Sequence, residues 1–203
     1  MATFTMIPNS ISGGVNQWKN QSNGTCAATD VDNDNGNTQY CYENSNSHEV
    51  SFGFPSPSVA EGDISSITSV QIALSAAYTL GSGINTRISS RMTDIPAGIN
   101  IDNGINTHSI TPGGSYANYT GAVENYSTGT TNWTYADLEA IIVLLDKISD
   151  TVSRSEARVS YLFLTVSYVA AGWSQETMNG IARSNIQKIN GIERSDIEKV
   201  NGV

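Results

Sequence analysis

Apolar and polar residues alternate along two long stretches, and this period of two predicts β-strands. The first stretch is residues 66–80, where one face is apolar. That face carries Ile67, Val70, Ile72, Leu74, Ala76 and Tyr78. The second stretch is residues 158–169, where both faces are largely apolar. Val159, Tyr161 and Phe163 fall on one face, and Leu162, Leu164 and Val166 fall on the other. We expect this second strand to be covered on both sides.

Shorter alternating segments predict further strands at residues 38–42, 49–54, 84–92, 103–110 and 116–122. We expect segment 84–92 to pair with segment 66–80 across Gly81-Ser82-Gly83. Thr134 and Asp137 have the spacing of a capping box, which predicts a short helix over residues 135–140. A buried strand at 141–145 follows it. About eight antiparallel strands, long polar loops and one short helix predict an all-β protein, a jelly-roll β-sandwich.

The C-terminal segment repeats itself every eleven residues. The pattern Asn-Gly-Ile-x-Arg-Ser-x-Ile-x-Lys-Ile/Val starts at Asn179, recurs at Asn190 and begins again at Asn201. Two structures fit each repeat. Ser184 with Gln187 has capping-box spacing and Gly191 can end a helix, so we favour one short helical turn per repeat. Each Asn-Gly pair also suits a two-residue hairpin turn.

The chain therefore divides into an N-terminal arm or edge strand (1–17), a jelly-roll domain (18–175) and a repeat tail (176–203). Each repeat is too small to bury its own apolar residues, because repeat units need neighbours. The tail could dock on its own domain, pack on another copy or stay disordered, and we favour contact between copies. The predicted assembly interface consists of Ile181, Ile186, Ile189, Ile192, Ile197, Val200 and Val203.

The net charge of the chain argues against some classes of binding partner. The net charge is −9, and residues 176–203 hold four acidic and four basic residues, so the whole excess lies on residues 1–175. An acidic body argues against nucleic acid and anionic membrane surfaces as partners. No apolar stretch is long enough for membrane insertion. No secretory signal is visible at the N-terminus, so the chain is either not exported by that route or already processed.

Cys26 and Cys41 are the only cysteines, and they flank an acidic loop. A disulfide between them would imply an oxidising compartment. The alternative is two free thiols. Asp30, Asp32 and Asp34 have the spacing that begins a calcium loop, but Asn35 and Cys41 stand where an EF-hand has its glycine and glutamate. We therefore expect an acidic surface loop, with calcium as a weak alternative and no other cofactor.

Catalytic motifs are not apparent in the sequence. His48 and His108 have no Cys or His partner at metal-ligand spacing, and no nucleophile elbow or phosphate loop occurs. Glu124, Asp137 and Glu139 could supply a glycosidase carboxylate pair, but their separation decides that question. We expect the protein not to be an enzyme.

Two further features concern the surface. Five Asn-x-Ser/Thr sequons are glycosylation candidates, but we favour chance as their origin in a chain this rich in Asn, Ser and Thr. They are Asn20, Asn23, Asn118, Asn125 and Asn132. A cluster of aromatic residues between positions 116 and 135 fits glycan binding or a subunit contact, although anchoring in the core is the more frequent explanation. It consists of Tyr116, Tyr119, Tyr126, Trp133 and Tyr135.

Several motifs occur in a particular order. A Trp18 near the start precedes Asp30-Val-Asp32-Asn-Asp34, and a long Ile/Val strand follows. Then come Trp133-Thr-Tyr-Ala-Asp-Leu138, the strand at 158–168 and the Asn-Gly-Ile/Val tail. This order resembles jelly-roll structural proteins of phages and environmental bacteria, such as the protomers of extracellular helical fibrils of the lotus-pond type. The family often has a glycine after the Trp-Thr segment, where this chain continues Ile141-Ile142-Val143.

The resemblance implies a structural, non-enzymatic protein outside the cell, on a fibril or virion surface. Its partner would be other copies of itself, joined into a helical filament through the jelly-roll body and the tail. The alternative function is a carbohydrate-binding jelly-roll module of a phage tail fibre or surface adhesin, with glycans as partners.

Overall fold

The fold was examined in a computed structural model of the chain. It describes residues 1–33, 38–44, 48–79, 86–94, 106–110, 114–127, 131–148 and 156–171, together with four short strands in the tail. None of the helices in these segments is long and apolar enough to cross a membrane.

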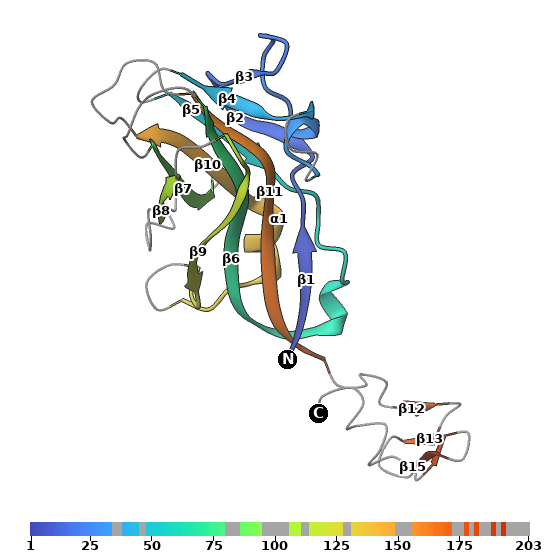
Figure 1. Cartoon of the computed structure of the whole chain (residues 1–203). Helices are drawn as coiled ribbons and strands as arrows, with labels where there is room; N and C mark the ends of the chain where they lie inside the picture. Colours follow the sequence, from blue (N-terminus) through green and yellow to red (C-terminus); the bar gives the residue numbers. More distant parts are fainter. Residues whose placement is uncertain are drawn as a thin grey trace.

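Two antiparallel sheets form the body (Figure 1). The first, sheet A, has the order β3 (Lys19–Asn20), β4 (Cys41–Glu43), β11 (Glu156–Ala170), β6 (Ile64–Thr79) and β9 (Ala117–Glu124), and β1 (Ala2–Met6) also pairs with β11. The second, sheet B, has the order β2 (Ser10–Asn16), β5 (Glu49–Gly53), β10 (Ile141–Ile148), β7 (Thr86–Asp94) and β8 (Asn106–Ile110).

The eight strands β4 to β11 have jelly-roll connectivity. Their order is β4-β11-β6-β9 in one sheet and β5-β10-β7-β8 in the other, which is the double Greek key of that fold. The predicted all-β jelly-roll sandwich is therefore confirmed. The expected pairing of segment 84–92 with segment 66–80 is wrong, because β7 crosses to sheet B and pairs with β10 and β8. Alternation shows which face a residue takes but does not identify the neighbouring strand.

The core lies between the sheets. β6 and β11 contribute their predicted apolar faces, including Leu74 and Leu164, and Phe52 and Leu145 of sheet B pack in the same cluster. All four side chains are essentially inaccessible to water. Burial of side chains of this size stabilises a fold by about 1.5–3 kcal/mol each.

A β-bulge in β11 changes which residues face the core. Val159 pairs with Ala76 but Tyr161 pairs with Ser75, so Ser160 is the extra residue. As a result Val159 and Leu162 are both buried, and the prediction that Val159 shares a face with Tyr161 is wrong. The outer face is only partly covered, because Tyr161, Phe163 and Thr165 keep intermediate exposure.

The helix α1 (Tyr135–Ala140) begins at the predicted capping box. The backbone N–H of Asp137 donates to Oγ1 of Thr134 (3.2 Å), and the N–H of Thr134 donates to Oδ2 of Asp137 (2.7 Å). Leu138 is buried and anchors this turn to the core. Strand β10 then follows without a break, at the place where the resembling family often has a glycine.

The tail forms β-hairpins, so the favoured helical interpretation is wrong. β12 (Thr177–Met178) pairs with β13 (Ile181–Ala182), and β14 (Lys188–Ile189) pairs with β15 (Ile192–Glu193). Each pair is antiparallel and separated by two residues, Asn-Gly in both cases. That is the alternative interpretation of the repeat, and Asn-Gly is favoured there because both residues tolerate positive φ. Among the described strands these two hairpins join neither sheet of the body.

Candidate functional site

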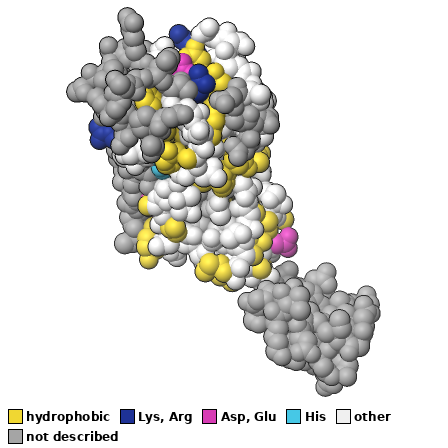
Figure 2. Space-filling view, in the orientation of Figure 1, with side chains coloured by type: hydrophobic (Ala, Val, Ile, Leu, Met, Phe, Trp, Pro, Cys, Tyr) yellow, Lys and Arg dark blue, Asp and Glu magenta, His cyan; other side chains and the backbone are white. Residues whose placement is uncertain are grey.

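The outer face of sheet A carries an aromatic pair. After the bulge at Ser160, Tyr161 and Phe163 point away from the core, and their ring centroids lie 4.8 Å apart with an interplanar angle of 35°. Their partners on β6 are small, Ser75 and Ala73. Ser75 and Ala73 are themselves buried, so the partly exposed rings of Tyr161 and Phe163 supply the apolar surface here. Figure 2 shows hydrophobic side chains scattered over the described part of the body, among backbone and other side chains and with few Lys, Arg, Asp or Glu side chains in view.

Arg158 adds a cationic guanidinium group to the same strand, β11, as the aromatic pair. The guanidinium carbon of Arg158 lies 4.5 Å from the ring centroid of Tyr40, and Nε of Arg158 pairs with Glu156. A cation over an aromatic ring is attracted by about 0.5–1 kcal/mol at exposed sites. Both contacts hold Arg158 against the sheet at the edge of the aromatic surface.

Tyr42 supports this end of the surface. Its ring lies 6.1 Å from that of Tyr40, and its hydroxyl donates to Oδ1 of Asn23. Burial, followed by the nearby carboxylate of Glu156, raises the pKa of the Tyr42 hydroxyl. Tyr42 therefore stays a hydrogen-bond donor at neutral pH and fixes the loop that carries Asn23.

Asp32 brings a carboxylate to the aromatic pair. It forms an isolated antiparallel bridge with Tyr161, and the N–H of Leu162 donates to the carbonyl of Val31 (3.0 Å). Residues bridged in this way share a side of the sheet, so Asp32 lies on the outer face. Nδ2 of Asn33 donates to Oδ1 of Asp32 (2.6 Å). We call Asp32, Tyr40, Arg158, Tyr161 and Phe163 the β11 patch.

Neutral polar groups continue the face beyond Phe163. Thr165 pairs with Gln71 on one side and Thr5 on the other. Nε2 of Gln71 donates to the carbonyl of Gly121 (2.8 Å), which holds the amide in place. Hydroxyl and amide groups both donate and accept, so this part of the face suits a ligand rich in hydroxyl groups.

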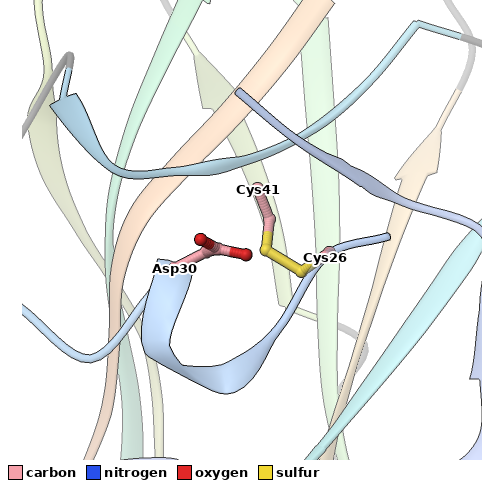
Figure 3. Close-up of side chains that lie close together, drawn as sticks. All are labelled: Cys26, Asp30 and Cys41. Carbon is pink, nitrogen blue, oxygen red and sulfur yellow. A yellow bond between two sulfur atoms is a disulfide. The ribbon is translucent and has the colours of Figure 1, made fainter. Parts of the chain in front are cut away.

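The disulfide positions the Asp32 loop. Cys26 and Cys41 are bonded to each other, with Cα atoms 5.3 Å apart (Figure 3). Asp30 lies beside them, and its Oδ2 accepts the N–H of Ala27 (2.8 Å) at the start of the 3₁₀ turn η1 (Ala28–Asp30). These contacts hold the loop against β4, and Asp32 follows directly.

The predicted aspartate loop is divided between two places. In the described chain, Asp30 clusters with the two disulfide sulfurs, whereas Asp32 lies with Tyr161. Asp34 is outside the described residues. Sulfur atoms joined in a disulfide are not thiolate ligands, so this cluster offers a metal only the Asp30 carboxylate.

The predicted aromatic cluster mainly anchors the core. Trp133 is buried, and its Nε1 donates to the carbonyl of Glu124 (2.9 Å). The hydroxyl of Tyr135 donates to the carbonyl of Val59 (3.2 Å), and Tyr119 packs edge-on against His108. Tyr126 is 43% exposed. The expectation that core anchoring is the more frequent role of these aromatics is confirmed for the buried Trp133. The β11 patch was not identified from the sequence, although alternation placed Tyr161 and Phe163 together.

The candidate carboxylates have separate environments. Glu124 is buried at the end of β9, and desolvation raises the pKa of its carboxyl group. Asp137 caps α1, and Glu139 is exposed on that helix. Of the histidines, His48 pairs with Glu43 (3.1 Å), and Nε2 of the buried His108 lies 2.9 Å from Oγ of Ser90.

The sequons differ in whether a hydrogen bond engages the asparagine side chain. Asn118, Asn125 and Asn132 are exposed. The side chains of Asn20 and Asn23 are engaged, since Oδ1 of Asn20 accepts two backbone N–H groups and Oδ1 of Asn23 accepts the Tyr42 hydroxyl. Of the predicted assembly residues, Ile181, Ile189 and Ile192 lie in the tail strands. The other four, Ile186, Ile197, Val200 and Val203, lie outside the described residues.

No protein-family model and no curated protein matches the sequence. Among solved structures, the CBM36-1 domain of a multidomain xylanase from the hindgut metagenome of Trinervitermes trinervoides is 14% identical. The match covers 82% of this chain and 97% of that one, with a TM-score of 0.41. CBM86, a low-affinity xylan-binding module from Roseburia intestinalis, is 7% identical over 83% of this chain and 96% of that one, with a TM-score of 0.36. These similarities are too low to assign a ligand.

Proposed function

We propose that this protein binds a neutral carbohydrate polymer through the β11 patch. The observation that carries the proposal is the partly exposed Tyr161–Phe163 pair on the outer face of sheet A. One side of a pyranose ring presents C–H groups, which pack on an aromatic ring. The face continues from Phe163 to Thr165 and Gln71, so it can contact more than one sugar unit.

Polar groups beside the rings supply the second requirement. A sugar hydroxyl can donate to the carboxylate of Asp32 and exchange hydrogen bonds with Thr165 or Gln71. The acidic body, with a net charge of −9, repels anionic polymers. The preferred ligand is therefore rich in hydroxyl groups and uncharged.

Affinity electrophoresis in native gels tests this proposal. Soluble xylan, glucan and mannan would be compared with an anionic polysaccharide, and at least one neutral polymer is expected to retard the protein. Tyr161→Ala and Phe163→Ala should each weaken binding by about tenfold, which corresponds to about 1.4 kcal/mol. Tyr126→Ala is the matched control, because it removes an exposed tyrosine outside the patch.

Melting temperatures of all three variants would confirm that the fold is intact. If no neutral polymer retards the native protein, the proposal is wrong. It is also wrong if Tyr161→Ala and Phe163→Ala bind as tightly as Tyr126→Ala.

We also propose a second function, self-assembly into a filament through the tail. Each tail hairpin has strands of two residues, and isolated two-stranded hairpins are marginally stable in water. A contact between copies that buried Ile181, Ile189 and Ile192 would contribute about 1.5–3 kcal/mol for each side chain before association costs. A second copy of the chain can offer that surface in a head-to-tail contact.

Negative-stain electron microscopy tests the second function. At low protein concentration the full-length protein is expected to form filaments, and a chain ending at Gln175 at the same concentration is expected to remain monomeric. Equal behaviour of the two chains would refute a role for the tail. Carbohydrate binding should survive the truncation, so the two proposed functions fail independently.

A further inference from the structure

The first strand of the chain completes sheet A at its edge. β1 pairs antiparallel with β11 from Ala2 opposite Tyr168 to Met6 opposite Leu164. Figure 1 shows β1 lying along β11 on the side away from β6. β11 is thus a central strand whose outer partner here is a five-residue segment next to the N-terminus.

Two side chains of β1 enter the core. Phe4 is 9% exposed and Met6 is 3% exposed, and the ring of Phe4 meets the ring of Tyr168 edge-on at 5.6 Å. Thr3 and Thr5 point outward and are exposed. Without β1, sheet A would expose a slot that fits a strand with an apolar residue at every second position.

A short link separates β1 from the rest of the body. Ile7, Pro8 and Asn9 lead from sheet A to sheet B, where the N–H of Asn9 donates to the carbonyl of Gly53 (3.1 Å). The proline ring fixes φ at position 8 and favours extended backbone at Ile7. The link is therefore stiff, and rotation at its ends can redirect β1 as a unit.

We propose that β1 is exchanged between copies of the chain, so that β1 of one molecule fills the slot beside β11 of the next. The contacts in the exchanged state are those already seen within one molecule, so little is lost apart from the entropy of association. Opening the slot requires the transient exposure of Phe4 and Met6, not of the whole core.

Each molecule gives one strand and receives one. If the receiver is not also the donor, the contact runs head to tail and leaves a slot free at one end. Such a contact extends into a chain of molecules. Strand exchange supplies an assembly contact that does not require the tail. The proposal of strand exchange therefore holds whether or not the tail or the β11 patch acts as proposed above.

Cysteine cross-linking tests the exchange directly. Thr5 and Thr165 are opposite each other on β1 and β11, and the native cysteines are already bonded to each other. A Thr5→Cys/Thr165→Cys protein would be incubated at high concentration, diluted and treated at once with a short bismaleimide. Denaturing, non-reducing electrophoresis then shows whether each link lies within one chain or between two.

The expected result is a ladder of covalent dimers and larger oligomers whose share rises with the concentration of the incubation. The matched control is Gln71→Cys/Thr165→Cys, a pair between the central strands β6 and β11. These strands cannot exchange without global unfolding, so only links within one chain are expected. A monomer band alone from the Thr5 pair at every concentration would overturn the proposal, as would an equal ladder from the control.

Discussion

Reduction of the Cys26–Cys41 disulfide is expected to destabilise the protein by about 3 kcal/mol. The two cysteines are 15 residues apart in sequence. In the chain-entropy model, a cross-link that closes a loop of about 15 residues removes about 3 kcal/mol of conformational freedom from the unfolded chain. For a chain of this size, 1 kcal/mol shifts the melting temperature by about 2–4 °C, so a decrease of about 6–12 °C is expected.

Urea unfolding with and without reductant is the assay. Wild type in reductant keeps both sulfur atoms, whereas Cys26→Ala/Cys41→Ala also removes them from buried positions. The double variant should therefore be less stable than the reduced wild type by the cost of the two small cavities, about 1 kcal/mol each. Reductant should have no effect on the double variant.

The reasoning would be refuted by a reduced wild type whose unfolding free energy lies within about 1 kcal/mol of the oxidised protein. That result would mean that the unfolded chain is already restricted in the region of this loop. The hydrogen bonds of Asp30 and Val31 would then hold the loop without the covalent link.

Two further substitutions test local features of the fold. Thr134→Ala removes the side-chain acceptor of the Asp137 N–H and should cost about 1 kcal/mol in urea unfolding, whereas Thr134→Ser should cost only a few tenths; equal losses would contradict the capping role. Burial lowers the pKa of His108 below the ordinary histidine value of about 6.5. The unfolded chain therefore takes up this proton first, and stability falls as pH decreases from about 6.5 towards the folded pKa. His108→Gln should weaken that decline in unfolding free energies measured at pH 7, 6 and 5, and a parallel decline in both proteins would show that His108 is not responsible.

Strand β6 could be predicted because apolar residues recur at every second position from Val70 onward. Val70, Ile72 and Leu74 are buried as this alternation predicts, although the small Ala73 between them is buried as well. The bulge at Ser160 could not be predicted. In a strand that is apolar on both faces, one extra residue does not visibly interrupt the alternation of apolar and polar positions. The same holds for the pairing of β7, which depends on where the chain crosses between the sheets.

The tail and the β11 patch show a different difficulty. In the tail, Ser184 with Gln187 indicated a helix and Asn190-Gly191 indicated a turn, and local patterns alone do not rank two such signals. In the patch, the shared face of Tyr161 and Phe163 was visible in the sequence. Asp32 reaches them through a bridge that spans more than a hundred residues of chain, and no spacing rule anticipates such a contact.

The position of β11 in the chain also determines when sheet A can form. Three segments of the N-terminal region line one side of β11 in turn: β4, then Val31 and Asp32, then β1. All of them, and β6 on the other side, leave the ribosome well before β11 does. Their apolar faces stay exposed until β11 has been synthesised. Sheet A therefore depends on contacts between segments that are far apart in sequence and that form late. We therefore expect slow folding that is completed only after Ala170 has been synthesised, and a nascent chain most prone to aggregation just before that point.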